Sequence, residues 1–139
     1  MGEKTASTRV IATENAPRAI GPDSQAIIAN GLVFTAGQIP LDPATMTVVE
    51  GGIAAQAEQV MRNVSAVLTA SGSSFDQVVK TTCFLTDLGN FLIFNEIYGR
   101  SFGTTPPARS TVQVAGLPLG VLVEVECVAL APGEPSNEA

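Results

Sequence analysis

Hydrophobic positions along the chain follow two different periods. Short segments rich in β-branched and other apolar side chains are typical of strands. The first two, residues 25–31 (QAIIANG) and 32–36 (LVFTA), meet at Asn30-Gly31, a dipeptide typical of a tight hairpin turn. Three further segments of this kind follow at 78–85 (VVKTTCFL), 109–115 (RSTVQVA) and 121–130 (VLVEVECVAL). The pattern therefore predicts five strands.

The period changes to that of a helix over residues 53–71. Apolar side chains recur there every three or four residues, which is typical of an amphipathic helix: Ile53, Ala57, Val60, Met61, Val64, Val67 and Leu68. The polar residues expected on the solvent side of this helix are Gln56, Gln59, Arg62 and Asn63. Gly72 is expected to follow its last turn, where glycine commonly ends a helix.

A second helix is predicted to begin after an N-cap at Asp87 or Asn90 and to run through Phe102. The element order is then β-β-α-β-α-β-β. This order predicts an α+β fold in which the helices lie on one face of a mixed sheet. We expect a single domain over residues 1–139, with a flexible tail at 132–139 because that stretch is polar and rich in turn-forming residues.

Composition adds an expectation of self-association. Only 14% of the residues are charged, against about 25% in average chains, so a domain this small has little polar cover for its surface. Burial in a homo-oligomer would resolve this. The net charge is −6, and the seven basic residues are scattered rather than gathered in a stripe. Nucleic-acid binding is therefore not expected.

The chain has no histidine, which excludes Ser-His-Asp and Cys-His catalysis and histidine metal sites. Its two cysteines, Cys83 and Cys127, stand in apolar runs and make poor zinc ligands. The first residues lack a secretory signal, and no apolar run is long enough to span a bilayer. We expect a cytoplasmic protein, with import into an organelle as the alternative.

Charged side chains interrupt the last two predicted strands. Arg109, Thr111 and Gln113 share one face of their strand, and Glu124 and Glu126 share one face of the next. The short turn at 116–120 indicates that the two strands are neighbours. One interpretation is a solvated sheet face whose ion pairs contribute little. The other is an anion site, in which arginine binds a carboxylate bidentately and a glutamate handles protons or orients water.

A series of short motifs resembles the RidA (YjgF) family of reactive-intermediate deaminases. They occur in family order between Arg9 and Leu130, as follows: Glu14–Pro17 with Ile20–Pro22, Ala36–Ile39, Gly51-Gly52, Val78–Thr82, Asn95–Tyr98, Pro107–Ser110, Val114–Pro118 and Val123–Glu126. The resemblance implies a chorismate-mutase-like fold and a homotrimer with ligand clefts between subunits. It also implies hydrolysis, without cofactor or metal, of 2-aminoacrylate and 2-aminocrotonate and their imines to 2-keto acids and ammonia.

The resemblance also implies roles for individual residues. Arg109 matches the arginine that binds the substrate carboxylate, and Glu124 matches the glutamate beside the attacking water. Gly37 and Thr111 match positions whose backbone contacts the ligand, and Asn95 matches an asparagine near the cleft. Glu126 falls in a matching motif, and we interpret it as structural.

One position departs from the family pattern. Asp23 stands where the family commonly has a tyrosine, and an ionised carboxylate neither donates a hydrogen bond nor forms an aromatic wall. Either Asp23 points away from the site, or the ligand differs, or the activity is reduced. Asp23 therefore favours an alternative function, a non-catalytic trimer that binds or senses 2-keto acids. A chaperone-like role is a further alternative, and the lack of histidine argues against a ribonuclease.

Overall fold

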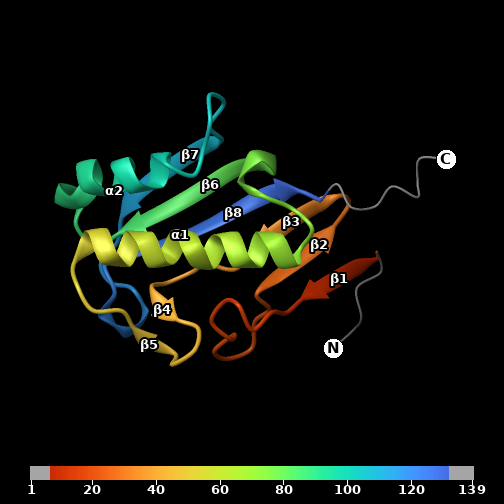
Figure 1. Ribbon diagram of the computed structural model, residues 1–139, viewed down its shortest axis with the longest axis horizontal. Coiled ribbons are helices and arrows are strands. Elements are labelled where there is room, and N and C mark those ends of the chain that lie inside the picture. Colours follow the sequence, from red (N-terminus) through yellow and green to blue (C-terminus); the bar gives the residue numbers. More distant parts are fainter. Residues whose placement is uncertain (1–6, 132–139) are drawn as a thin grey trace.

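Two helices cover one face of a six-stranded sheet in the computed structural model, which describes residues 7–131 (Figure 1). The strand order is β1-β2-β3-β8-β6-β7, and only the β6–β7 pair is parallel. The sheet strands are β1 (Thr8–Ile11), β2 (Ala26–Ala29), β3 (Leu32–Thr35), β6 (Val78–Leu85), β7 (Ala108–Gln113) and β8 (Val123–Leu130). The helices are α1 (Ile53–Ala70) and α2 (Phe91–Gly99). The predicted α+β fold with a mixed sheet is confirmed.

Short sequence motifs correctly predict several of the turns and caps at which these elements end. The β2–β3 hairpin turns at Asn30 and Gly31, which adopt φ of 55° and 75°. Only a residue that tolerates the left-handed region suits such a turn. Gly72, at φ 75°, follows α1 as expected. Asp87 caps a short 3₁₀ turn (Leu88–Asn90) by accepting from the Gly89 amide, and α2 then ends at Gly99, before the expected Phe102.

The expected pairing of the last two strands is wrong. Strand β6 lies between β7 and β8, parallel to the first and antiparallel to the second. The reason is the β6-α2-β7 crossover, which places two consecutive strands side by side and parallel. The connection from β7 to β8 must therefore cross from one side of β6 to the other. The turn at residues 116–120, which includes a 3₁₀ turn at Pro118–Gly120, belongs to this longer connection.

Three short strands were not predicted. Strand β1 is an edge strand of four residues, three of them exposed, so it lacks the alternation that reveals a half-buried strand. Strands β4 (Leu41–Asp42) and β5 (Thr47–Val48) form a separate two-stranded sheet around Pro43. The tail expected at 132–139 lies outside the described residues. The expected domain, residues 1–139, therefore extends beyond them at both ends.

The solvent side expected for α1 is wrong for three of its four polar residues. Gln56, Gln59 and Asn63 are buried, while Arg62 is exposed as expected. Asn63 donates hydrogen bonds to the backbone carbonyls of Ile39 and Leu41, 3.1 and 2.9 Å away. A polar side chain can therefore lie in the interior when it satisfies backbone groups that a loop leaves unpaired.

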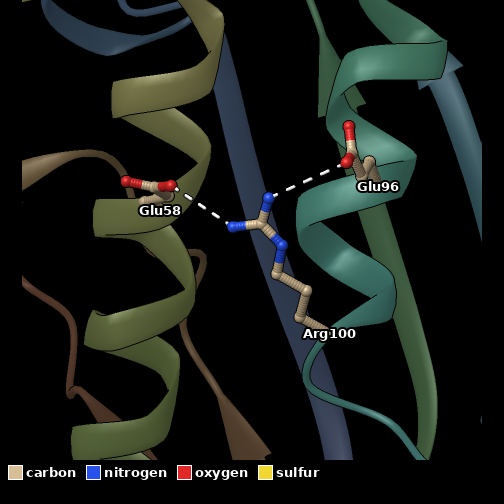
Figure 2. Close-up of polar contacts among 3 residues, drawn as sticks. All are labelled: Glu58, Glu96 and Arg100. Carbon is tan, nitrogen blue, oxygen red and sulfur yellow. Dashed lines mark hydrogen bonds and ion pairs between the residues drawn. The ribbon is translucent and has the colours of Figure 1, made fainter.

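Figure 2 shows two ion pairs of Arg100, one that reaches α1 and one with a residue of α2 itself. Arg100 lies 3.4 Å from Glu58 of α1 and 3.9 Å from Glu96 of α2. The side chains are largely exposed, so these contacts contribute little to stability. The helices are held instead by the buried apolar cluster they share with the sheet, which includes Val64, Phe94 and Val125. Neither described helix has the length and apolar character that crossing a membrane requires.

Candidate active site

The strand register places Arg109 and Glu124 on opposite faces of the sheet. Arg109 pairs with Thr81 on β6, whose hydroxyl lies 2.7 Å from that of Tyr98 on α2. Arg109 therefore stands on the face that the helices cover. Glu124 pairs with Phe84 of β6, and residues 81 and 84 lie on opposite faces because side chains alternate along a strand. The side chains of Arg109 and Glu124 therefore cannot meet within one chain.

Helix α2 supports the Arg109 guanidinium from three positions. Arg109 Nη1 donates to Asn95 Oδ1 at 2.8 Å. The guanidinium carbon lies 4.7 Å from the centre of the Tyr98 ring and 5.4 Å from that of Phe91. Residues 91, 95 and 98 share one face of a helix, which is why they converge on a single group. Cation–π contacts and one charge-assisted hydrogen bond thus orient the guanidinium fork.

The same group borders a cavity of about 360 Å³ that we call the arginine cavity. It is lined by Asn95, Tyr98, Gly99, Phe102, Gly103, Pro106, Pro107 and Arg109. Burial raises the pKa of Tyr98, so its phenol stays neutral and remains paired with Thr81. The sequence analysis assigned no site role to Phe91 or Tyr98. Their spacing of three and four residues from Asn95 was the signal that connects them to the site.

Thr111 and Cys83 lie beside Arg109 on the helix-covered face. The two are register partners on β7 and β6. Thr111 Oγ1 is buried and has no hydrogen-bond partner in the structure. Burial raises the pKa of Cys83 to about 11, against the opposing effect of the Arg109 charge, and burial likewise raises that of Cys127 to about 11. Both thiols therefore stay protonated near neutral pH, and neither supplies a thiolate nucleophile.

Glu124 lies directly against the backbone of Gly37. A Cβ atom at position 37 would collide with the Glu124 carboxylate, so only glycine allows this contact. Both residues line a cavity of about 290 Å³, which we call the glutamate cavity, and Asp23 lines it too. The structure therefore brings together three residues singled out in the sequence, and Asp23 lies at the cavity rather than away from it.

The electrostatic environments of the two cavities are opposite. Burial raises the pKa of Glu124, and the neighbouring Glu126 carboxylate on the same face adds to that effect. Apolar side chains supply most of the wall, among them Ile20, Ile39 and Leu119. A proton or a donor group is therefore favoured near Glu124, whereas an anion is favoured at Arg109.

A buried amide, which the sequence did not reveal, holds the loop of residues 13–24 that forms one wall of the glutamate cavity. Gln25 Oε1 accepts from the Thr13 amide at 2.6 Å. Its Nε2 lies within 3.3 Å of three backbone carbonyls, those of Thr13, Ala16 and Pro17. One side chain thus satisfies four backbone groups, which fixes the loop that carries Asp23. No group of three or more metal-ligating side chains is found within residues 7–131.

Known proteins resemble the chain over most of its length. The family described as Endoribonuclease L-PSP matches residues 13–131. The human protein named 2-iminobutanoate/2-iminopropanoate deaminase is 45% identical over 122 residues, 88% of this chain and 89% of its own. The Arabidopsis thaliana protein named Reactive Intermediate Deaminase A, chloroplastic, is 50% identical over 120 residues, 86% of this chain and 64% of its own. The crystal structure of E. coli TdcF with bound serine has a TM-score of 0.83 at 40% identity, covering 88% of this chain and 98% of that one.

The raised pKa of Glu124 predicts a pH-dependent cost to stability. A carboxyl group whose pKa is higher in the folded state stabilises the fold below its unfolded pKa, and that contribution is lost as pH rises through the folded value. Glu124→Gln should therefore unfold at higher urea concentration than the wild type at pH 7. The advantage should disappear below about pH 4, where the carboxyl is protonated in both states. Glu50→Gln, at an exposed position, is the control. An equal advantage at both pH values would contradict this prediction.

Proposed function

The chain belongs to the Endoribonuclease L-PSP (RidA/YjgF) family, and on that premise we propose that it deaminates reactive imines and enamines of small 2-keto acids by hydrolysis. The substrates are 2-aminoacrylate, 2-aminocrotonate and their imines, and the products are 2-keto acids and ammonia. The observation that supports this best is the Arg109 fork, oriented by Asn95 and two aromatic rings beside an open cavity. Such a fork binds a carboxylate bidentately.

We infer that the complete site forms between subunits of a homotrimer. Arg109 and Glu124 lie on opposite faces of one sheet, so a second copy must supply one of them. The face that carries Glu124 also leaves apolar side chains uncovered: Val10 (63% exposed), Phe34 (44%), Val112 (41%) and Leu130 (44%). An uncovered sheet face of this kind is typical of a protein–protein interface. In this arrangement the arginine cavity of one subunit meets the glutamate cavity of the next.

The mechanism divides the work between the two cavities. Arg109 binds the substrate carboxylate and fixes the reacting carbon, with the Gly37 and Thr111 backbone amides as further donors. The enamine tautomerises to the imine, and Glu124 orients a water molecule and accepts its proton as the oxygen attacks the imine carbon. Glu124 returns that proton to the imine nitrogen, which gives the carbinolamine, and then carries the carbinolamine hydroxyl proton to the same nitrogen. The C–N bond breaks as the C=O bond forms, which releases ammonia and leaves the 2-keto acid. A glutamate with a raised pKa suits this proton shuttle, and no step requires a cofactor or metal.

A second candidate function rests on Asp23. Asp23 lines the glutamate cavity together with Glu124 and Arg18, and its negative charge would oppose the carboxylate of an approaching substrate. A trimer that binds 2-keto acids through Arg109 without turning over imines would share the same fold and the same arginine cavity. Turnover separates the two candidates, because a sensor binds 2-ketobutyrate but does not accelerate imine hydrolysis.

The first test is a coupled assay in which a serine or threonine dehydratase generates the enamine and keto-acid release is followed. The wild type should accelerate release, and Arg109→Ala should lower kcat/KM by about 100-fold or more, because a bidentate charge-assisted pair contributes on the order of 3 kcal/mol. Arg100→Ala removes an exposed arginine near the end of α2 and serves as the control. Wild-type turnover in Arg109→Ala would show that the site is misassigned.

Subunit mixing tests the shared site. Arg109→Ala and Glu124→Gln should each retain only a small residual rate alone. After the two are unfolded together and reassembled, random trimers should recover about one quarter of the wild-type sites, because each mixed trimer has one intact pair of cavities. Arg109→Ala mixed with Asn95→Ala should recover nothing, since both changes lie in the same cavity. If the first mixture keeps only the residual rate while trimers form, the cavities do not combine across subunits.

Removing the Asp23 charge should improve substrate capture. Asp23→Asn is expected to lower KM for 2-iminobutanoate by about threefold to tenfold at low salt, because repulsion across a partly solvated site is on the order of 1 kcal/mol. Molar salt should screen most of the difference. Asp76→Asn, a change of equal charge outside the cavity, should leave KM unchanged. A KM that Asp23→Asn leaves unaltered, or raises, would remove Asp23 from the site.

A further inference from the structure

Two buried amides on α1 hold two chain segments that contribute residues to the glutamate cavity. Gln56 Oε1 accepts a hydrogen bond from the Leu122 amide at 2.8 Å. Asn63 Nδ2 donates to the carbonyls of Ile39 and Leu41. Gln56 and Asn63 are seven residues apart, so they lie two turns from each other on the same face of the helix. One helix thus holds two chain segments that are far apart in sequence.

The segment held by Gln56 carries Glu124. It begins at Pro118 and Leu119, which line the cavity, and Leu119 adopts φ of 59° in the turn before β8. The register between β8 and β6 begins at Val123, and just before it the Leu122 carbonyl accepts from the Thr86 amide at 3.2 Å, which leaves the Leu122 amide to be satisfied. The Leu122 amide therefore has no strand partner, and Gln56 is the acceptor that satisfies it. Since Leu122 lies two residues before Glu124, this bond fixes where the carboxylate-bearing strand begins.

The segment held by Asn63 lines the cavity from Gly37 through Ile39 to Leu41. Its Gln38 is also bound to Val125 of β8 through two backbone hydrogen bonds of 2.8 and 3.2 Å. The orientation of the Asn63 amide is itself fixed, because its Oδ1 accepts from Gln59 Nε2 at 2.9 Å. Gln59 Oε1 in turn accepts from Arg62 at 3.0 Å. This chain of hydrogen bonds directs the Asn63 amino group toward the two carbonyls, and Asn63 is only 1% exposed.

Packing alone does not require amides at these positions. The apolar contacts of α1 come from Val60, Val64, Val67 and Leu68, which are fully buried on the same helix. A leucine at position 56 would fill a similar volume, but it would leave the Leu122 amide without an acceptor. The chemical feature that Gln56 provides is therefore the hydrogen bond, and its effect falls on the segment that carries Glu124.

We propose that Gln56 is a positioning residue for Glu124. The proposal rests on the hydrolytic function proposed above. Gln56 touches no substrate atom and acts through the backbone of Leu122. Its loss should therefore lower kcat, which depends on where Glu124 holds the water, and should spare KM, which depends on Arg109 in the other cavity.

The test compares Gln56→Leu with Gln56→Glu, which keeps an oxygen able to accept from the Leu122 amide. Gln56→Leu should lower kcat about tenfold and change KM by less than about twofold. Gln56→Glu should restore kcat to within about threefold of the wild type. Glu58→Gln, on the exposed side of the same helix, is the matched control and should change neither constant. An unchanged kcat in Gln56→Leu would overturn the proposal.

A double-mutant cycle separates positioning from general destabilisation. In a Glu124→Gln background, Gln56→Leu should have no further effect on the residual rate, because the group it positions is absent. A loss that is equally large in that background would overturn the proposal. Amide hydrogen exchange gives a readout that needs no activity: the Leu122 amide should exchange at least about tenfold faster in Gln56→Leu. A wild type without turnover would refute the proposed function, whereas unchanged Leu122 exchange would refute the role of Gln56. If Gln56→Leu does not fold, Gln56→Met replaces it in each comparison.

Discussion

Strand β6 lies between β7 and β8, and the charged groups of the candidate site take their positions from this arrangement. Its register with β7 turns Arg109 toward α2, and its register with β8 turns Glu124 to the other face. Side-chain alternation allows no other outcome for these three strands. In the proposed function one chain carries two half-sites, and the self-association expected from its few charges would complete the site.

Because Arg109 and Glu124 lie on opposite faces of the sheet, neither neutralises the other and both can interact with a ligand. If Arg109 and Glu124 met within one chain, they would pair with each other and leave little binding capacity for a ligand. Arg109 is instead stabilised by Asn95 and by two aromatic rings, which leaves part of its fork open. Burial raises the pKa of Glu124, and the Glu126 charge adds to that effect. Each half-site thus presents the charge that its part of the reaction needs.

Buried amides satisfy backbone groups of the segments that line and adjoin the glutamate cavity. Gln25, Gln56 and Asn63 each satisfy backbone groups of a different segment. Backbone groups in loops must find partners when they are buried, so these side chains replace the ladder that a strand would supply. The conformational entropy of these segments is therefore lost when the chain folds, before a ligand binds.

The sequence by itself determined the local elements and the chemical groups. Its two hydrophobic periods located both helices and five strands, Asn30-Gly31 predicted the hairpin, and period-two alternation assigned Arg109 and Glu124 to faces of their own strands. Asp23, Gly37 and Glu124 were singled out from motifs, and the structure places all three at one cavity. Only the tertiary structure decided that β6 separates β7 from β8, that Tyr98 lies against Arg109, and that Gln56 and Asn63 are buried. Alternation reports which face a residue takes within its own strand, but the order of strands and the partners of a buried amide depend on contacts between segments distant in sequence.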